Sequence, residues 1–194
     1  MVQTADAKIY TAQEYLELEV NSPERHEYID GEIRLMTGGT PDHNTIAGNL
    51  LTALKLALKG KSYRVFITDQ RLWIPACEQY TYPDVMVIEK PLVLQAGRTD
   101  TVMNPSFIAE VLSQSTADYD RGGKFAAYRT LPTFREYLLV DQYAAHVEHY
   151  VKTAPNQWLM SEYASLDMAL SLDTFDCQIT ISELYQDVEF VEAS

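Results

Sequence analysis

Hydrophobic residues recur with two different periods along the chain, and each period predicts a kind of element. Between residues 43 and 59 the apolar positions lie three to four residues apart, which places them on one face of a helix. They include Ile46, Leu50, Leu54 and Leu58. Gly60 follows where helices commonly end, and Asp42 or Asn44 stands where a helix is capped. We therefore predict a long helix over residues 43–59.

A shorter helix and a hairpin are predicted before this long helix. Thr11 and Glu14 have the spacing of a capping box, and Pro23 ends the segment that follows them. Asp30-Gly31 is a tight-turn dipeptide with strand-prone residues on either side. We expect a helix after Thr11 and a β-hairpin over residues 27–36.

Beyond Gly60 the pattern changes to the short apolar runs that are typical of strands. Strands are expected over residues 63–75, 82–89 and 106–113, and the last of these is almost entirely apolar apart from Glu110. A helix over residues 116–131 ends before Pro132. Further strands are expected over residues 136–141, 145–153 and 157–164, and a strand and a short helix over 177–186. This order predicts an α/β (α+β) fold, a sandwich with a mixed central β-sheet flanked by helices.

We interpret residues 1–194 as a single domain, because no repeat, low-complexity segment or flexible linker divides the chain. Its expected core spans about residues 10–153, and residues 154–194 form an acidic C-terminal extension. No run of 18 apolar residues is present and the first residues lack a signal-peptide pattern, so we expect a cytoplasmic protein without a membrane segment. Cys77 and Cys177 are expected to be buried free thiols.

The net charge of −13 argues against a nucleic-acid partner, because phosphate binding depends on Lys and Arg. The distribution weakens this objection, since residues 154–194 hold eight acidic residues and no Lys or Arg. Basic residues gather in two groups, which leaves room for a local positive face. The groups are Lys55, Lys59, Lys61 and Arg64, and then Arg121, Lys124, Arg129 and Arg135.

Three polar residues stand out within or beside the expected strands. Asp84 follows Pro83 at the start of one strand, Glu110 interrupts an apolar strand, and Lys124 lies on the next helix. A carboxylate buried on a strand costs several kcal/mol or so unless it is paired or binds a cation. Two such carboxylates on adjacent strands would favour Mg²⁺, and a nearby lysine could orient a water or stabilise developing charge. This combination indicates phosphodiester hydrolysis.

Several motifs resemble the Uma family of restriction-endonuclease domains, within the PD-(D/E)XK nuclease superfamily. The resemblance covers about residues 10–153 and includes the opening segment RHEYIDGEIRLMTGGTPDHNTIAGNL. Its motifs appear here as Pro83-Asp84, as Glu110-Val111-Leu112-Ser113-Gln114-Ser115-Thr116, as Asp120 to Lys124 to Tyr128, and as Glu136-Tyr137 to Val140-Asp141. The resemblance implies a restriction-endonuclease-like fold and a metal-dependent endonuclease that acts on DNA with Mg²⁺ or Mn²⁺.

The resemblance also implies a set of site residues. Asp84 and Glu110 would bind the metal, and the backbone carbonyl of Val111 would complete its shell. The superfamily places a lysine two residues after the acid, where this chain has Leu112. The family resemblance instead assigns the catalytic lysine to the following helix, as Lys124.

Residues of the opening segment are further candidates by the same resemblance. Glu27 or Glu32 would supply another acid, and His43 would lie near the mouth of the site. A homodimer is expected, because cutting both strands of duplex DNA needs two sites.

Less specific interpretations stay open for these residues. Asp84 could cap a turn, and Lys124 could form an exposed i,i+4 pair with Asp120, worth only a few tenths of a kcal/mol. Tyr128 is expected to be a core residue, and His26, His146 and His149 to be surface or strand residues. For the whole protein, the acidic tail and the displaced lysine motivate an alternative: a nuclease-fold binding or regulatory module with weak or absent catalysis.

Overall fold

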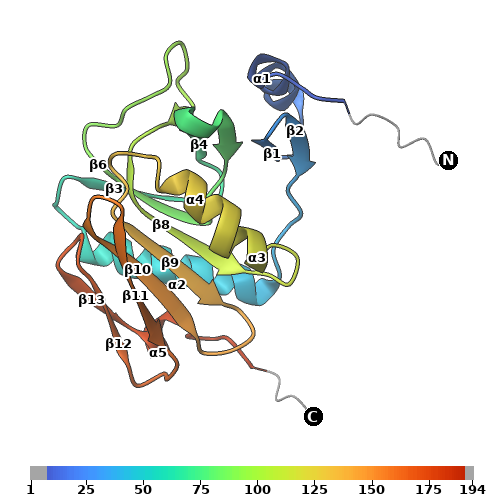
Figure 1. The fold of residues 1–194 in the computed structure, drawn as a ribbon. Helices are drawn as coiled ribbons and strands as arrows, with labels where there is room; N and C mark the ends of the chain where they lie inside the picture. Colours follow the sequence, from blue (N-terminus) through green and yellow to red (C-terminus); the bar gives the residue numbers. More distant parts are fainter. Residues whose placement is uncertain (1–7, 191–194) are drawn as a thin grey trace.

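A six-stranded mixed sheet lies at the centre of the protein, as the computed structural model shows for residues 8–190 (Figure 1). Its strand order is β11-β10-β9-β8-β6-β3. The strands are β3 (Tyr63–Ile67), β6 (Val85–Glu89), β8 (Pro105–Leu112), β9 (Glu136–Asp141), β10 (Val147–Ala154) and β11 (Gln157–Tyr163). β8 and β9 run parallel and the other neighbours antiparallel, so the predicted mixed sheet and α+β class are confirmed.

A second sheet has the order β2-β1-β5-β4-β7, and a two-stranded hairpin follows near the C-terminal end. The second sheet consists of β1 (His26–Ile29), β2 (Glu32–Leu35), β4 (Arg71–Ile74), β5 (Gln79–Thr81) and β7 (Thr101–Val102), and the hairpin of β12 (Ala169–Leu172) and β13 (Cys177–Thr180). β1 and β2 form the predicted hairpin, because Asp30 and Gly31 both adopt the positive φ that its two-residue turn requires.

Helices pack on both faces of the central sheet. The long helix α2 (Pro41–Ala57) lies on one face, and a helical stretch made of α3 (Ala117–Tyr119), a π-helical turn (Asp120–Lys124) and α4 (Phe125–Tyr128) lies on the other (Figure 1). α1 (Ala12–Asn21) begins with the predicted capping box of Thr11 and Glu14, and α5 (Ile181–Leu184) follows β13. A short 3₁₀ turn covers Pro75–Cys77.

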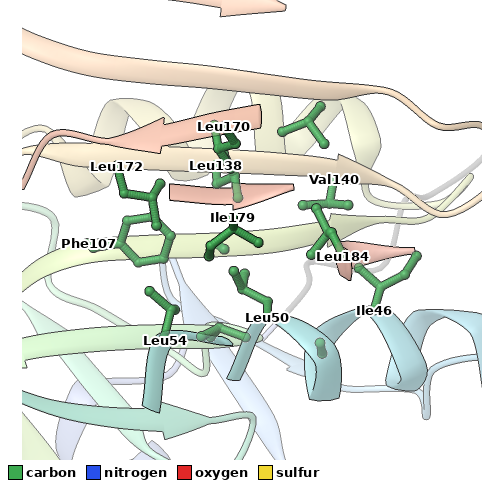
Figure 2. Close-up of a cluster of buried hydrophobic side chains, with 14 of the residues drawn as sticks. Ile46, Leu50, Leu54, Phe107, Leu138, Val140, Leu170, Leu172, Ile179 and Leu184 are labelled. Carbon is green, nitrogen blue, oxygen red and sulfur yellow. The ribbon is translucent and has the colours of Figure 1, made fainter. Parts of the chain in front are cut away.

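The alternation of side chains along the central strands separates two hydrophobic cores. One core joins α2 to the β12–β13 hairpin and α5, and Figure 2 shows Leu50 and Leu54 of α2 near Phe107 and Ile179. The other core lies beneath α4 and includes Met86, Ile108 and Tyr137. Residues beyond position 153 therefore contribute directly to the first core.

The structure corrects several predicted boundaries. Thr40, rather than Asp42 or Asn44, caps the long helix, and Pro41 opens it with the fixed φ that suits a first helical position. The strand expected over residues 63–75 is divided into β3 and β4, which belong to different sheets, because the chain turns at Thr68 with a positive φ. The strand expected from residue 82 begins at Val85, and β12 was not predicted.

Two expectations about single residue types also change. Cys77 and Cys177 are free thiols as expected, but they are only partly buried. The second basic group does not form one positive face, because Lys124 is buried and Arg121 pairs with Glu148 at 2.7 Å. Over residues 8–190, every helix is too short or too polar to traverse a lipid bilayer.

Candidate active site

Asp84 and Glu110 lie opposite each other where β6 begins and β8 runs beside it. Val85 pairs with Ala109, so the antiparallel register brings residue 84 level with residue 110. The Asp84 backbone N–H donates to Glu110 Oε2 at 3.4 Å, and the Val111 N–H donates to Asp84 Oδ2 at 2.8 Å. The two predicted metal-binding carboxylates and the backbone of Val111 therefore lie at one place.

Lys124 reaches the same place from the helical stretch above this face of the sheet. Its Nζ lies 3.4 Å from Glu110 Oε1, 3.5 Å from Glu27 Oε1 and 3.2 Å from Asp120 Oδ1. The π-helical turn Asp120–Lys124 directs Asp120 and Lys124 inward together, and such turns are frequent at functional sites. Lys124 does form the i,i+4 ion pair with Asp120, but the expectation that this pair is exposed is wrong, because both side chains are buried.

The opening segment supplies two more side chains. Glu27 on β1 accepts a hydrogen bond from the Thr81 hydroxyl on β5, which fixes it beside Lys124. His43, in the first turn of α2, places its Nε2 3.1 Å from Asp84 Oδ2. Glu32 does not take part, since it is exposed and pairs with Arg34 at 2.7 Å. The structure thus brings together Asp84, Glu110, Lys124, Glu27 and His43, and leaves Glu32 outside.

Burial and neighbouring charges perturb the acid–base behaviour of the site. Burial, with a smaller contribution from the charges of Asp84 and Asp120, raises the pKa of Glu110 to about 8, although Lys124 and the Tyr128 hydroxyl oppose the shift. Burial disfavours the charged form of Lys124, but Glu110, Glu27 and Asp120 outweigh it and raise the pKa of Lys124 above its ordinary value. Lys124 is therefore an ammonium ion at neutral pH.

His43 shows the same balance at the edge of the site. Burial disfavours the imidazolium, but the hydrogen bond and the charge of Asp84 outweigh it and raise the pKa of His43. Its Nδ1 is buried without a hydrogen-bond partner among residues 8–190. Because of Asp84, the His43 imidazole is protonated more readily than that of a free histidine.

The donors present fit a hard divalent cation. Four acidic side chains, from Glu27, Asp84, Glu110 and Asp120, share the site with Lys124 and His43, so acidic groups outnumber basic ones. Across the part of the chain that the structure describes, no three His, Cys, Asp or Glu side chains converge as a ready metal cage. Mg²⁺ is commonly bound by one or two carboxylates and several waters, so Asp84 and Glu110 provide enough protein ligands for it.

Asp120 and Tyr128 are site residues that the sequence analysis left aside. The Tyr128 hydroxyl donates to Glu110 Oε1 at 2.6 Å, and Asp120 is 2% exposed beside Lys124. Their spacing contained a usable signal, because Asp120, Lys124 and Tyr128 are four residues apart and lie on one helix face. Because Tyr128 is expected in the core, Asp120 and Lys124 on the same helix face are expected to point inward as well.

Comparison with known proteins connects this geometry to a nuclease family. A model of the Uma2 family, described as "Putative restriction endonuclease", matches residues 12–182, which extends past the region of resemblance seen in the sequence. Two uncharacterized proteins of Synechocystis sp. are similar to this chain, one 45% identical over 84% of the chain and 92% of its own length, the other 34% identical over 92% of both. The crystal structure of a "putative nuclease belonging to DUF820" from Anabaena variabilis superposes with a TM-score of 0.73 at 18% identity, covering 90% of this chain and 97% of the other. At this identity the superposition shows a shared fold.

Proposed function

The chain belongs to the Uma2 family, and from this premise we propose that it is a metal-dependent endonuclease that hydrolyses DNA phosphodiester bonds. One observation carries the proposal: the side chains of Asp84 and Glu110 lie side by side, each hydrogen-bonded to backbone N–H groups of the facing strand segment, and the Lys124 ammonium lies 3.4 Å from Glu110. Paired carboxylates with an adjacent cationic donor match the demands of phosphodiester hydrolysis, where negative charge develops on the phosphate oxygens.

Each site residue has a role that follows from its position. Asp84 and Glu110, with the Val111 carbonyl, would hold Mg²⁺ or Mn²⁺, which supplies Lewis-acid polarisation and a bound water of lowered pKa. Lys124 remains charged and can donate a hydrogen bond to an attacking water or to a developing negative oxygen. His43 orients Asp84 and carries a proton at Nε2. Glu27 forms an ion pair with Lys124 and so helps to hold its ammonium in place.

Metal binding is the first property to test. Calorimetric titration of the full chain with Mn²⁺ and with Mg²⁺ should show binding that Asp84→Ala and Glu110→Ala each weaken strongly. Glu32→Ala is the matched control, because this acid is exposed and paired with Arg34 outside the site. Equal binding by all four proteins would remove Asp84 and Glu110 as ligands.

Cleavage of plasmid DNA in the presence of Mn²⁺ tests the reaction itself. We expect nicking or linearisation by the native chain and loss of activity in Lys124→Met. Salt-dependent DNA binding without cleavage by the native chain would instead favour a binding or regulatory module.

We also propose that the active form is a homodimer, because cutting both strands of a duplex needs two sites. Light scattering of the chain in solution, with and without duplex DNA, should give twice the monomer mass. A monomer that still linearises plasmid in one encounter would contradict this.

A further inference from the structure

The Lys124 ammonium lies among acidic side chains from three separate elements. Glu27 comes from β1, Glu110 from β8 and Asp120 from the π-helical turn, each 3.2–3.5 Å from Nζ. The Lys124 side chain is only 9% exposed, so solvent contributes little to screening these charges. The acidic side chains would repel one another without a cation between them.

Asp120 is the least explained member of this group. Its side chain is 2% exposed, and its Oδ1 makes no hydrogen bond among residues 8–190, although Lys124 Nζ lies 3.2 Å away. Within the same residues, Lys124 is the one ion-pair partner found for Asp120 and for Glu27. Both acidic side chains therefore have a single ammonium to balance their charge, although Glu27 also accepts a hydrogen bond from Thr81.

The two oxygens of Glu110 have different partners. Oε1 faces Lys124 at 3.4 Å and accepts from Tyr128, whereas Oε2 faces the backbone N–H of Asp84. An ion between Asp84 and Glu110 would approach the Oε2 side. It would then share the Glu110 carboxylate with the ammonium on the other side.

We propose that Lys124 is the resident cation of this acidic cluster, anchored by Asp120 and Glu27 as positioning residues, and that it competes electrostatically with a divalent ion for Glu110. This role of Lys124 rests on the proposed function, because it concerns the same metal site. Lys124 thereby stabilises the site before an ion binds, and it sets how tightly the ion is held. Like charges at this range repel strongly even at a high effective dielectric constant.

The test compares two substitutions on the same turn that change charge in opposite directions. Lys124→Met should bind Mn²⁺ on the order of tenfold more tightly than the native chain, because a competing positive charge is lost. Asp120→Asn should bind Mn²⁺ more weakly, because a negative charge is lost. Lys55→Met and Asp118→Asn, which change exposed residues, are the matched controls and should leave the affinity unchanged.

Thermal unfolding in EDTA provides a second readout that needs no metal. Lys124→Met should unfold at a lower temperature than the native chain and than Lys55→Met, and Mn²⁺ should restore more of its stability than it adds to the native chain. Should Lys124→Met fail to fold, the affinity of Asp120→Asn decides the proposal in its place.

The outcomes separate this proposal from the proposed function. Mn²⁺ binding by the native chain with equal or weaker affinity in Lys124→Met would overturn the role of Lys124 and leave the metal site standing. Absence of Mn²⁺ binding in every protein would overturn the metal site. The comparison in EDTA would then decide alone, and an unchanged unfolding temperature would refute Lys124 as the resident cation.

Discussion

Gly123 lies where the π-helical turn meets the ring of Tyr119, and replacing it gives a sharp test of this local packing. A Cβ at Gly123 would lie 2.7 Å from Tyr119 Cδ2 and closer still to Cε2, so the ring must move. The Tyr119 hydroxyl currently accepts a hydrogen bond from Gln79 Nε2 at 3.0 Å. Moving the ring by about 1 Å therefore stretches that bond beyond a normal length.

The magnitude follows from three contributions. Overpacking costs about 1–3 kcal/mol, and the lost hydrogen bond costs a further ~1 kcal/mol. Replacing glycine by alanine in a helical segment returns up to about 1 kcal/mol. Gly123→Ala should therefore destabilise the protein by about 1–3 kcal/mol. The adjacent Gly122→Ala should be neutral or stabilising by up to ~1 kcal/mol, because a Cβ there meets nothing within 4 Å.

Thermal and urea unfolding of the two variants measures the difference directly. For a chain of this size, the expected difference of about 1–4 kcal/mol between them corresponds to about 2–16 °C in unfolding temperature. The same Gly123→Ala change in a Tyr119→Ala background should lose its cost, which isolates the ring as the cause. Equal effects at Gly122 and Gly123, or a cost that persists without the Tyr119 ring, would refute the reasoning.

Three further changes probe the interior. Glu136 is a fully buried acid that pairs with His149 at 2.6 Å and accepts hydrogen bonds from the backbone N–H groups of Asp173 and Thr174. Glu136→Ala should therefore lower the free energy of unfolding in urea by about 3–5 kcal/mol. A decrease below ~1 kcal/mol would contradict the importance of this pairing. Tyr128→Phe leaves Glu110 Oε1 without its buried donor and should cost about 1–3 kcal/mol in the same assay, whereas no change would show that the hydroxyl is dispensable. Because burial raises the pKa of Glu110 to about 8, above the ordinary 4.5, the folded state keeps a proton that the unfolded state releases, and stability should fall as the pH rises from 4.5 to 8. Glu110→Gln should flatten that pH dependence in unfolding curves, and an unchanged slope would assign it to other groups.

Periodicity predicted those elements whose stability is largely local. The capping box at Thr11, the turn at Asp30-Gly31 and the apolar stripe of the long helix all depend on residues a few positions apart. The structure agrees with each of them to within about two residues, except for the cap at Thr40. Such features depend on contacts that a short stretch of sequence already contains.

Features that depend on distant contacts were predicted less well. The division of β3 from β4 is decided by pairing with β6 on one side and with β5 on the other, and no local signal distinguishes the two sheets. The pairing of Glu136 with His149 is also non-local, because it joins β9 to β10 and to the loop after β12. His149 was expected on a strand, but the sequence did not predict that its side chain is buried.

The candidate site was predicted at Asp84 and Glu110 because burial of a carboxylate is costly wherever the chain places it. Glu110 stood out within an apolar strand before any contact was known. Glu27 and His43 came from the family resemblance rather than from any physical signal in the sequence. Their approach to Lys124 and Asp84 depends on how the second sheet and the start of α2 meet the central sheet.

The displaced lysine shows why a sequence spacing can be lost while an arrangement in space is retained. Leu112, two residues after Glu110, shares its face of β8, and this face packs beneath the helical stretch that carries Lys124. A lysine at position 112 would extend from the strand into the space that Leu112 fills with apolar contacts around Tyr128. A lysine on the helix above reaches Glu110 from the opposite direction and leaves that core intact. The proposed chemistry requires only an ammonium beside the acid, so a lysine on either element would supply it. The π-helical turn directs Lys124 inward, whereas a regular exposed helix position would not.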